Sequence, residues 1–258
     1  MKHDKQAKIW LERKFHQAEV AQIDTMMSIQ PPESSTTRIV RLETDKKYSP
    51  KTPRNEFETI QAQCQKAFHV IYDYLIYGQR YFLKLSSNEK TKLLNEIKQG
   101  QENILSIIQT NKLNATLNSS NSLQDILNYS PQTIDKFYLV GLACLENKAY
   151  QNARDVFKVL VLIHPHYHNF WLGLAMCQQA LGQWEEAIQA YSFAEVTDAK
   201  DPIPYLHESE CHALLHDNIQ AVIAVDKALH CVEDDENNEF VDFKRLANEW
   251  KQTLLKSA

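Results

Sequence analysis

The residues best suited to chemistry in this 258-residue chain are its histidines, because imidazole is the commonest metal ligand and acid–base group near neutral pH. His164, His166 and His168 alternate along one short segment, which falls where a helix is expected to end. His212 and His216 are four residues apart, a spacing at which two imidazoles on one helix face can chelate a metal. No third ligand stands at a matching distance from this pair. We therefore expect solvated loop histidines in the first group, and no metal or cofactor at either place.

No catalytic motif accompanies these histidines. The sequence contains no glycine-rich phosphate loop, nucleophile elbow or paired-carboxylate motif. An odd number of cysteines without close pairs favours reduced thiols over a disulfide framework. The five are Cys64, Cys144, Cys177, Cys211 and Cys231. We expect the middle three to be inert thiols buried in helix packing, and we expect no enzyme activity.

The composition is that of a globular protein and excludes several classes of function. The net charge of -5 argues against a general nucleic-acid surface, which needs a clustered basic excess. The longest apolar run, residues 137–145, is far shorter than the roughly twenty residues of a membrane span. The first twenty residues lack the apolar centre of a secretory signal, so we expect a cytoplasmic protein. Only five glycines and few strand-like alternations favour an all-α chain.

An aromatic residue recurs every 34 residues along the C-terminal half, at Phe137, Trp171 and Tyr205. A small residue follows each aromatic after four positions, and an alanine recurs at the same interval further on. These are Gly141, Ala175 and Ser209, and then Ala153, Ala187 and Ala221. This pattern is typical of tetratricopeptide repeats, in which each unit is a helix hairpin and a small residue admits a bulky one from the neighbouring helix. The sequence therefore predicts an all-α fold with three such hairpins stacked as an α-solenoid.

The predicted helices can be placed approximately. The pairs are expected at 132–147 and 150–163, at 166–181 and 184–197, and at 203–216 and 218–231. Ser130 followed by Pro131 is typical of a helix start. The corresponding repeats are residues 134–167, 168–201 and 202–235, followed by a capping helix at about 236–256. An apolar stripe on this last helix can close the third repeat: Phe240, Phe243, Ala247, Trp250 and Leu254.

The first 130 residues are organised differently. Residues 1–54 are expected to form an N-terminal helix and a linker rich in proline, serine and threonine. Residues 55–130 form a second region, in which one helix has apolar positions from Phe57 to Phe82 and another begins at a capping box of Ser86 and Glu89. The repeat region then spans 131–258. Shielding of the repeats, homodimer formation and binding of a second partner all remain open roles for the front half.

The first helix of each hairpin lines the inner face of such a stack. Residues one position after each aromatic, and four and seven further, are therefore expected to face a groove. They are Tyr138, Leu142, Leu145, Leu172, Met176, Gln179, Leu206, Glu210 and Ala213. Most are apolar, which favours binding of an extended apolar peptide from another protein. In the alternative, the protein's own N-terminal segment covers this stripe, which is then core and leaves no groove.

The second and third repeats carry a set of residues that points to one family. The set comprises Gly173, Leu174, Cys177, Gln179, Ala187, Ile188, Tyr191, Ser192, Asp201, Pro202, Pro204, His207, Glu210 and Cys211. In these residues the chain resembles the class II chaperones of type III secretion, the LcrH/SycD group, over about residues 130–255. The resemblance implies a bacterial cytoplasmic holdase without catalysis or cofactor. Its concave surface would bind a short segment of a secreted translocator protein and prevent premature aggregation.

Within this resemblance, Tyr138 and Leu142 stand where the family places groove aromatics, whereas Leu145 replaces another aromatic with an aliphatic side chain. The family also has a much shorter segment before its repeats. One alternative function is chaperoning of another secretion-apparatus subunit. A second is a generic adaptor that clamps a carboxylate with Lys and Asn on the inner helices. The residues at those clamp positions are Gly141, Leu145, Ala175 and Gln179, so a carboxylate would find no cationic partner.

Overall fold

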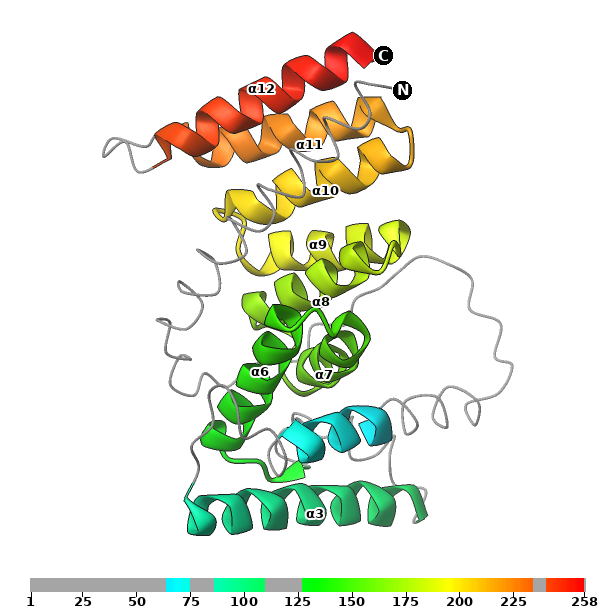
Figure 1. Cartoon of the computed structure of the whole chain (residues 1–258), viewed down its shortest axis with the longest axis vertical. Helices are drawn as coiled ribbons and strands as arrows, with labels where there is room; N and C mark the ends of the chain where they lie inside the picture. Colours follow the sequence, from blue (N-terminus) through cyan, green and yellow to red (C-terminus); the bar gives the residue numbers. More distant parts are fainter. Residues whose placement is uncertain (1–63, 75–85, 110–126, 234–239, 258) are drawn as a thin grey trace. The chain divides into compact units, whose positions relative to one another are not determined.

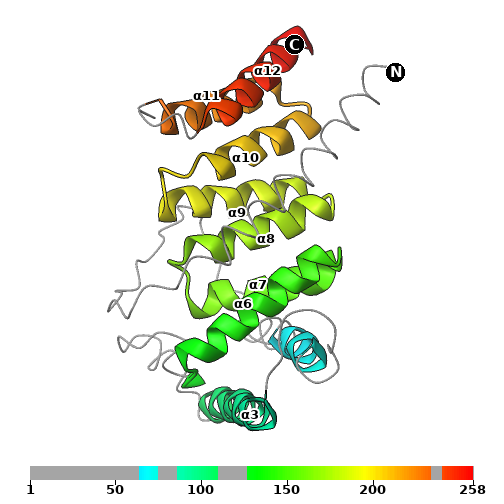
Figure 2. The same cartoon turned by 60° about the vertical axis from the view of Figure 1, so that its left-hand side comes forward.

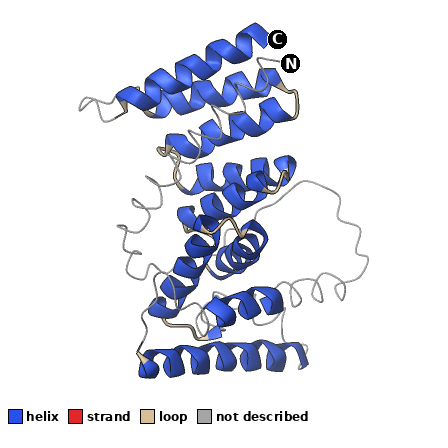
Figure 3. Cartoon of the chain, viewed as in Figure 1, coloured by secondary structure: helices blue, strands red, loops and turns tan. Residues whose placement is uncertain are grey.

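The computed structural model describes residues 64–74, 86–109, 127–233 and 240–257. These ranges contain helices joined by turns and loops, and no strand occurs within them (Figure 3). All of them fall in one compact unit. The predicted N-terminal helix and linker of residues 1–54, and most of the predicted helix from Phe57 to Phe82, lie outside the described residues. None of the helices described here combines the length and apolar character needed to cross a membrane.

Six helices form the three predicted hairpins. They are α6 (Pro131–Glu146), α7 (Tyr150–Ile163), α8 (His168–Ala180), α9 (Trp184–Thr197), α10 (Pro202–Leu214) and α11 (Asn218–Cys231). Their bounds agree with the sequence prediction to within two residues. Each helix packs on the next one along the chain, and α6 also contacts α8 (Figures 1 and 2). The all-α fold of three hairpins is therefore confirmed.

Two of the hairpins start at a predicted type of cap. Ser130 lies before α6 and its side-chain oxygen accepts a hydrogen bond from the Thr133 amide, with Pro131 at the first helical position. Asp201 does the same for the amide of Ile203 at the start of α10, again followed by proline. A side-chain acceptor satisfies an amide that has no partner inside the helix, and proline has no amide to leave unpaired. These capping residues and prolines therefore determine where the first helix begins in repeats 1 and 3.

The core between the first two repeats is built around one aromatic ring. Phe157 of α7 is fully buried, and its ring edge faces Gly141 on α6 and Gly173 on α8. The two glycines lie on the helices that flank α7, and each has no side chain to hold that helix away from the ring. Close helix packing of this kind is what the alternation of small and bulky residues predicts.

The C-terminal helix α12 (Val241–Ser257) closes the third repeat. Ala247 and Leu254 are buried against Ala221 and Val225 of α11, with Phe243 and Trp250 partly buried beside them. Trp250 also donates its indole N–H to Ser209 Oγ at 2.9 Å. The predicted capping role is confirmed for these positions, whereas Phe240 at the start of the stripe remains 36% exposed.

At the other end, residues 64–74 (cyan in Figure 1) and α3 (Ser87–Gln109) contact the first repeat. Phe68 meets Tyr129 and Phe137 edge-on, with ring centroids 6.4 and 6.1 Å away. From α3, Glu96 accepts hydrogen bonds from the Ser130 amide and hydroxyl and from the Thr133 hydroxyl. Burial opposes the charge on Glu96, but these donors prevail and lower its pKa below the ordinary value. The contacts cross the predicted boundary at residue 130.

The capping box predicted for α3 is present. Ser86 donates its amide and its hydroxyl to the Glu89 carboxylate at 2.8 and 2.7 Å, and the Glu89 amide returns a hydrogen bond to Ser86 Oγ at 3.3 Å. Two backbone donors at the helix start are therefore satisfied reciprocally. Further along α3, Gly100 lies against the ring of Tyr129, where a Cβ atom would collide. α3 is thus positioned closely on the residues that lead into α6.

Candidate functional site

The nine predicted groove residues all lie on the first helices of the hairpins, α6, α8 and α10. Six of them, on α6 and α8, are buried: Tyr138, Leu142, Leu145, Leu172, Met176 and Gln179. The three on α10, which are Leu206, Glu210 and Ala213, are half-buried. Leu206 and Ala213 pack against the cluster that α11 and α12 form, so their contacts are accounted for by the C-terminal cap. The assignment of these nine residues to a peptide groove stays a prediction.

Tyr138 lies in an aromatic cluster that joins the first two repeats. Its ring centroid is 6.1 Å from that of Phe157, 6.4 Å from that of Tyr167 and 5.4 Å from that of Phe170. These partners come from α7, from the turn before α8 and from α8 itself. The contacts with Phe157 and Tyr167 are edge-to-face, an arrangement that adds to the stability from area burial alone. The Tyr138 hydroxyl, however, is buried and has no hydrogen-bond partner among the described residues.

A polar network crosses from α8 to α10 and includes two of the predicted groove residues. Tyr191 of α9 donates its hydroxyl to Gln179 Oε1, and Gln179 Nε2 donates to Glu210 Oε2 at 2.9 Å. His207 Nδ1 lies 2.9 Å from the same carboxylate oxygen, and the His207 ring stacks on Tyr191 with centroids 5.7 Å apart. Gln179 therefore uses both ends of its amide. The network fixes the side chains of the inner helices relative to one another.

Next to this network, two carboxyl groups from α9 and α10 lie together. Burial, followed by the hydrogen bond and charge of Glu208, raises the pKa of Glu195 to about 8, although Lys227 lowers it. Glu208 also accepts from Ser192 Oγ at 3.4 Å and lies 3.8 Å from His212 Nε2. A protonated Glu195 can donate to Glu208, which satisfies a buried polar contact that two carboxylates could not make.

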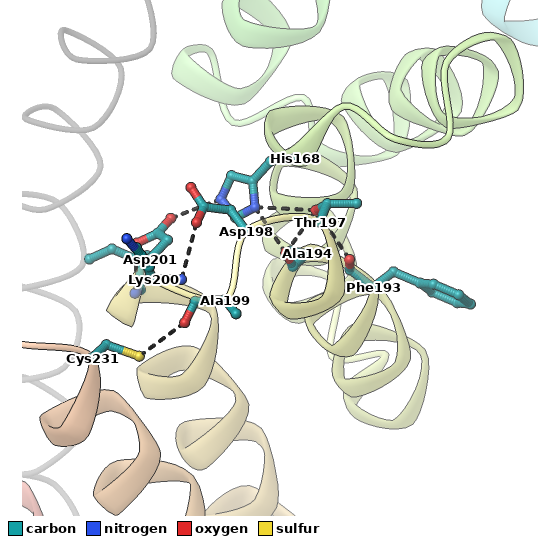
Figure 4. A network of polar contacts seen from close by, with 10 residues as sticks. His168, Phe193, Ala194, Thr197, Asp198, Ala199, Lys200, Asp201 and Cys231 are labelled. Carbon is teal, nitrogen blue, oxygen red and sulfur yellow. Dashed lines mark hydrogen bonds and ion pairs between the residues drawn. The ribbon is translucent and has the colours of Figure 1, made fainter. Parts of the chain in front are cut away.

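His168 is not the solvated loop histidine that the sequence predicts. It begins α8, with Nε2 2.8 Å from Asp201 Oδ2 and Nδ1 3.0 Å from the Ala194 carbonyl (Figure 4). Burial lowers the pKa of His168, but Asp201, the Ala194 carbonyl and Asp198 together raise it above the ordinary value. When both ring nitrogens carry protons, this histidine donates to α9 and to the N-cap of α10 at once. It thereby links the second repeat to the third.

The other histidines considered as metal ligands do not come together in the structure. His164 is half-buried and His166 is exposed. His212 pairs with Glu208, and His216 occupies a left-handed turn with φ 62°. Within the residues the structure covers, no three histidine, cysteine or acidic side chains are grouped closely enough to hold a metal ion. The arrangement provides no metal-ligand set there.

The prediction of buried thiols is confirmed for the three repeat cysteines. Cys144, Cys177 and Cys211 are free and buried. Burial raises the pKa of Cys144 to about 11, and it raises those of Cys177 and Cys211 as well. Since the thiolate is the reactive form, these thiols are poorly suited to nucleophilic chemistry near neutral pH.

Comparison with known proteins supports the interpretation of the repeats. Residues 145–203 match the tetratricopeptide repeat family. The three hairpins are tetratricopeptide repeats. The low calcium response locus protein H of Yersinia pestis is 33% identical over 82 residues, which are 32% of this chain and 49% of that protein. The predicted resemblance to the LcrH/SycD chaperones is thus confirmed, and the chain spans about half the length of the curated relatives it matches.

One solved structure shows the same helical fold, and a second gives a lower score. A type III secretion complex from Aeromonas hydrophila superposes with a TM-score of 0.52 at 23% identity, covering 56% of this chain and 95% of that one. SycD of Yersinia enterocolitica, solved with a peptide of the translocator YopD, gives a TM-score of 0.47 at 26% identity. That comparison covers 50% of this chain and 98% of SycD.

Sequence reasoning missed the inter-repeat contacts of the tetratricopeptide region. His168 and Asp201 are 33 residues apart, and Gln179 and Glu210 are 31 apart, so both pairs are separated by close to one repeat. Side chains near one period apart on the same helix of successive units become neighbours when the units stack. A search for polar pairs at this separation would have found both contacts.

Proposed function

We propose that the tetratricopeptide repeats bind a short apolar segment of a secreted, translocator-type protein and keep that protein from aggregating before export. The repeats act by binding rather than by catalysis, and they do so in the bacterial cytoplasm. The observation that carries the proposal is the similarity to the low calcium response locus protein H, together with the mostly apolar set of residues on the inner helices α6 and α8. The peptide class is the one with which SycD was solved.

The energetics of such binding are adequate. Burying about 500 Å² of apolar surface gives roughly 12 kcal/mol at about 25 cal/mol per Å². Ordering of about ten flexible residues and the loss of rigid-body freedom consume much of this free energy. Micromolar to nanomolar affinity is the expected range. Met176 suits this role because its unbranched, polarisable side chain adapts to different partners.

A generic adaptor that clamps a carboxylate is the less favoured alternative. One of its expected clamp positions holds Gln179, which donates to the Glu210 carboxylate. A second carboxylate at this place would meet a negative charge instead of a lysine. Chaperoning of another secretion-apparatus subunit remains a narrower alternative, and the identity of the bound protein decides it.

The test is capture of the client by the full chain. Met176→Gln keeps the length of the side chain but makes it polar, and Leu142→Glu places a charge on α6. Both variants should lose most of a co-purifying apolar client from the native cell, identified by mass spectrometry, while circular dichroism shows unchanged helical content. Val196→Gln, at an 80% exposed position of α9, is the control. Full client capture by a folded Met176→Gln protein would show that the inner helices do not bind it.

A further inference from the structure

The two ends of the candidate groove are polar, whereas its middle is apolar. Tyr138 on α6 carries a hydroxyl, and Glu210 on α10 carries a carboxylate. Leu172 and Met176 of α8 stand between them in the order of the helices, and Leu142 lies one turn after Tyr138 on α6. Each polar end has an unused hydrogen-bonding capacity, which indicates what kind of segment the groove accepts.

At the first end, the Tyr138 hydroxyl is a donor without an acceptor. The side chain is 8% exposed, its ring contacts Phe157, Tyr167 and Phe170, and its oxygen has no hydrogen-bond partner within the ranges that the structure describes. Burial raises the pKa of this phenol well above its ordinary value, so the group keeps its proton. An unpaired buried hydroxyl destabilises a protein, and a main-chain carbonyl from a bound segment would remove that penalty.

At the other end, Glu210 is an acceptor with capacity to spare. The hydrogen bond from Gln179 and the contact with His207 both involve Oε2, so neither of them uses Oε1. A carboxylate accepts at both oxygens. No lysine or arginine pairs with Glu210 in the part of the chain that the structure describes. Glu208, two residues before Glu210, adds negative charge on the same helix. His207 already lies at Oε2, so a lysine or arginine donor to Oε1 is the group that would complete this end of the groove.

We propose that the groove selects an extended segment with a main-chain acceptor for Tyr138 at one end, apolar side chains in the middle, and a lysine or arginine for Glu210 at the other end. This selection rests on the proposed peptide-binding function. Packed helices lie about 8–10 Å apart, so the path from α6 over α8 to α10 is about 20 Å. An extended chain rises about 3.3 Å per residue, which places the two polar contacts about six residues apart.

The experiment uses the full chain and an array of fluorescent decapeptides with leucine or valine at alternate central positions. One residue beside this apolar centre is lysine, glutamine or glutamate, and it is placed at either end so that both directions of the segment are tested. Anisotropy should show about tenfold tighter binding for lysine than for glutamine, and the weakest binding for glutamate. The preference for lysine should also decrease as salt is added.

Two conservative variants connect this preference to the structure. Glu210→Gln should abolish the preference for lysine over glutamine, while Glu185→Gln, at an exposed position of α9, should keep it. Tyr138→Phe should weaken binding of all the peptides about fivefold and leave the melting temperature equal or higher, because only the unpaired hydroxyl is removed. Tyr72→Phe, at a 45% exposed position, should change neither quantity.

The outcomes separate the two proposals. Unchanged affinity in Tyr138→Phe, or a lysine preference that persists in Glu210→Gln, overturns the proposed selection. If Met176→Gln still weakens binding in that case, peptide binding in the groove is upheld. If no apolar-centred peptide binds, or if Met176→Gln binds them as well as the unmodified chain does, peptide binding by the inner helices is wrong and the selection is wrong with it.

Discussion

Gly173 of α8 should tolerate alanine much less well than Gly141 of α6, although both glycines face the same ring. A Cβ atom on Gly173 would lie less than 3.0 Å from three atoms of the Phe157 ring, whereas on Gly141 the two nearest ring atoms are 3.0 and 3.1 Å away. Phe157 is fully buried and cannot retreat from both sides. The same substitution therefore probes two different fits against one side chain.

The expected magnitudes follow from two opposing effects. Replacing glycine by alanine inside a helix stabilises it by about 1 kcal/mol. Overpacking a filled core costs about 1–3 kcal/mol, and the closer approach at Gly173 places that variant at the upper end of this range. We expect Gly173→Ala to lower the free energy of unfolding by about 2 kcal/mol, and Gly141→Ala to change it by less than about 1 kcal/mol.

Urea denaturation of the full chain, followed by tryptophan fluorescence and circular dichroism, measures both values. The corresponding decrease in melting temperature for Gly173→Ala is roughly 4–8 °C for a folded region of this size. Adding Phe157→Leu to Gly173→Ala should recover part of the loss, because the smaller side chain removes the collision, and this gives a coupling between the two sites. Equal stability of Gly173→Ala and the unmodified chain, or a larger loss in Gly141→Ala, would refute the packing described around Phe157.

Three further predictions concern charged groups between elements. Because the pKa of Glu195 is raised above its unfolded value, stability should fall as the pH rises from about 4.5 through about 8, and Glu195→Gln should flatten this dependence. Urea titrations at pH 5 and 8 measure it, and equal free energies of unfolding of the unmodified chain at the two pH values would contradict it. The raised pKa of His168 means that its contribution is complete below pH 6.5 and lost as the pH rises through the folded value, so His168→Gln should be more destabilising at pH 5.5 than at pH 9. Glu96→Gln should lower the free energy of unfolding at pH 7 by about 1–2 kcal/mol. The difference should shrink as the pH falls below 4.5, because the lowered pKa of Glu96 contributes stability that is lost on protonation, and thermal melts at pH 7 and 4 measure it.

The sequence predicted the helices well because their positions follow from a repeated local pattern. The period of 34 residues placed all six hairpin helices to within two residues, and Ser130 and Ser86 marked helix starts through contacts only three residues away. Contacts between repeats depend instead on the rotation of one unit against the next. The repeat alignment pointed to Ala175 as the counterpart of Gly141, but the tightest approach to Phe157 is at Gly173.

The same limit explains the histidine that was assigned wrongly. Nothing local distinguishes His168 from His166, because its partner Asp201 is supplied by the start of the next repeat. For the groove, the sequence predicted which helix face the nine residues share but not their burial, which depends on everything that packs against that face. Their role in binding a peptide stays a prediction.

The aromatic contact of Phe68, Tyr129 and Phe137 has a consequence for how this array of repeats is terminated. A stacked hairpin presents a bare apolar side at its outer end, and an uncovered end invites another copy to add on. Here Phe137 of the first hairpin is fully buried, Phe68 and Tyr129 lie against its ring, and Gly100 of α3 lies against Tyr129, so these residues occupy the side where a preceding hairpin would pack. A fragment that begins at Pro131 would lose these contacts and should self-associate through the exposed end of the first hairpin.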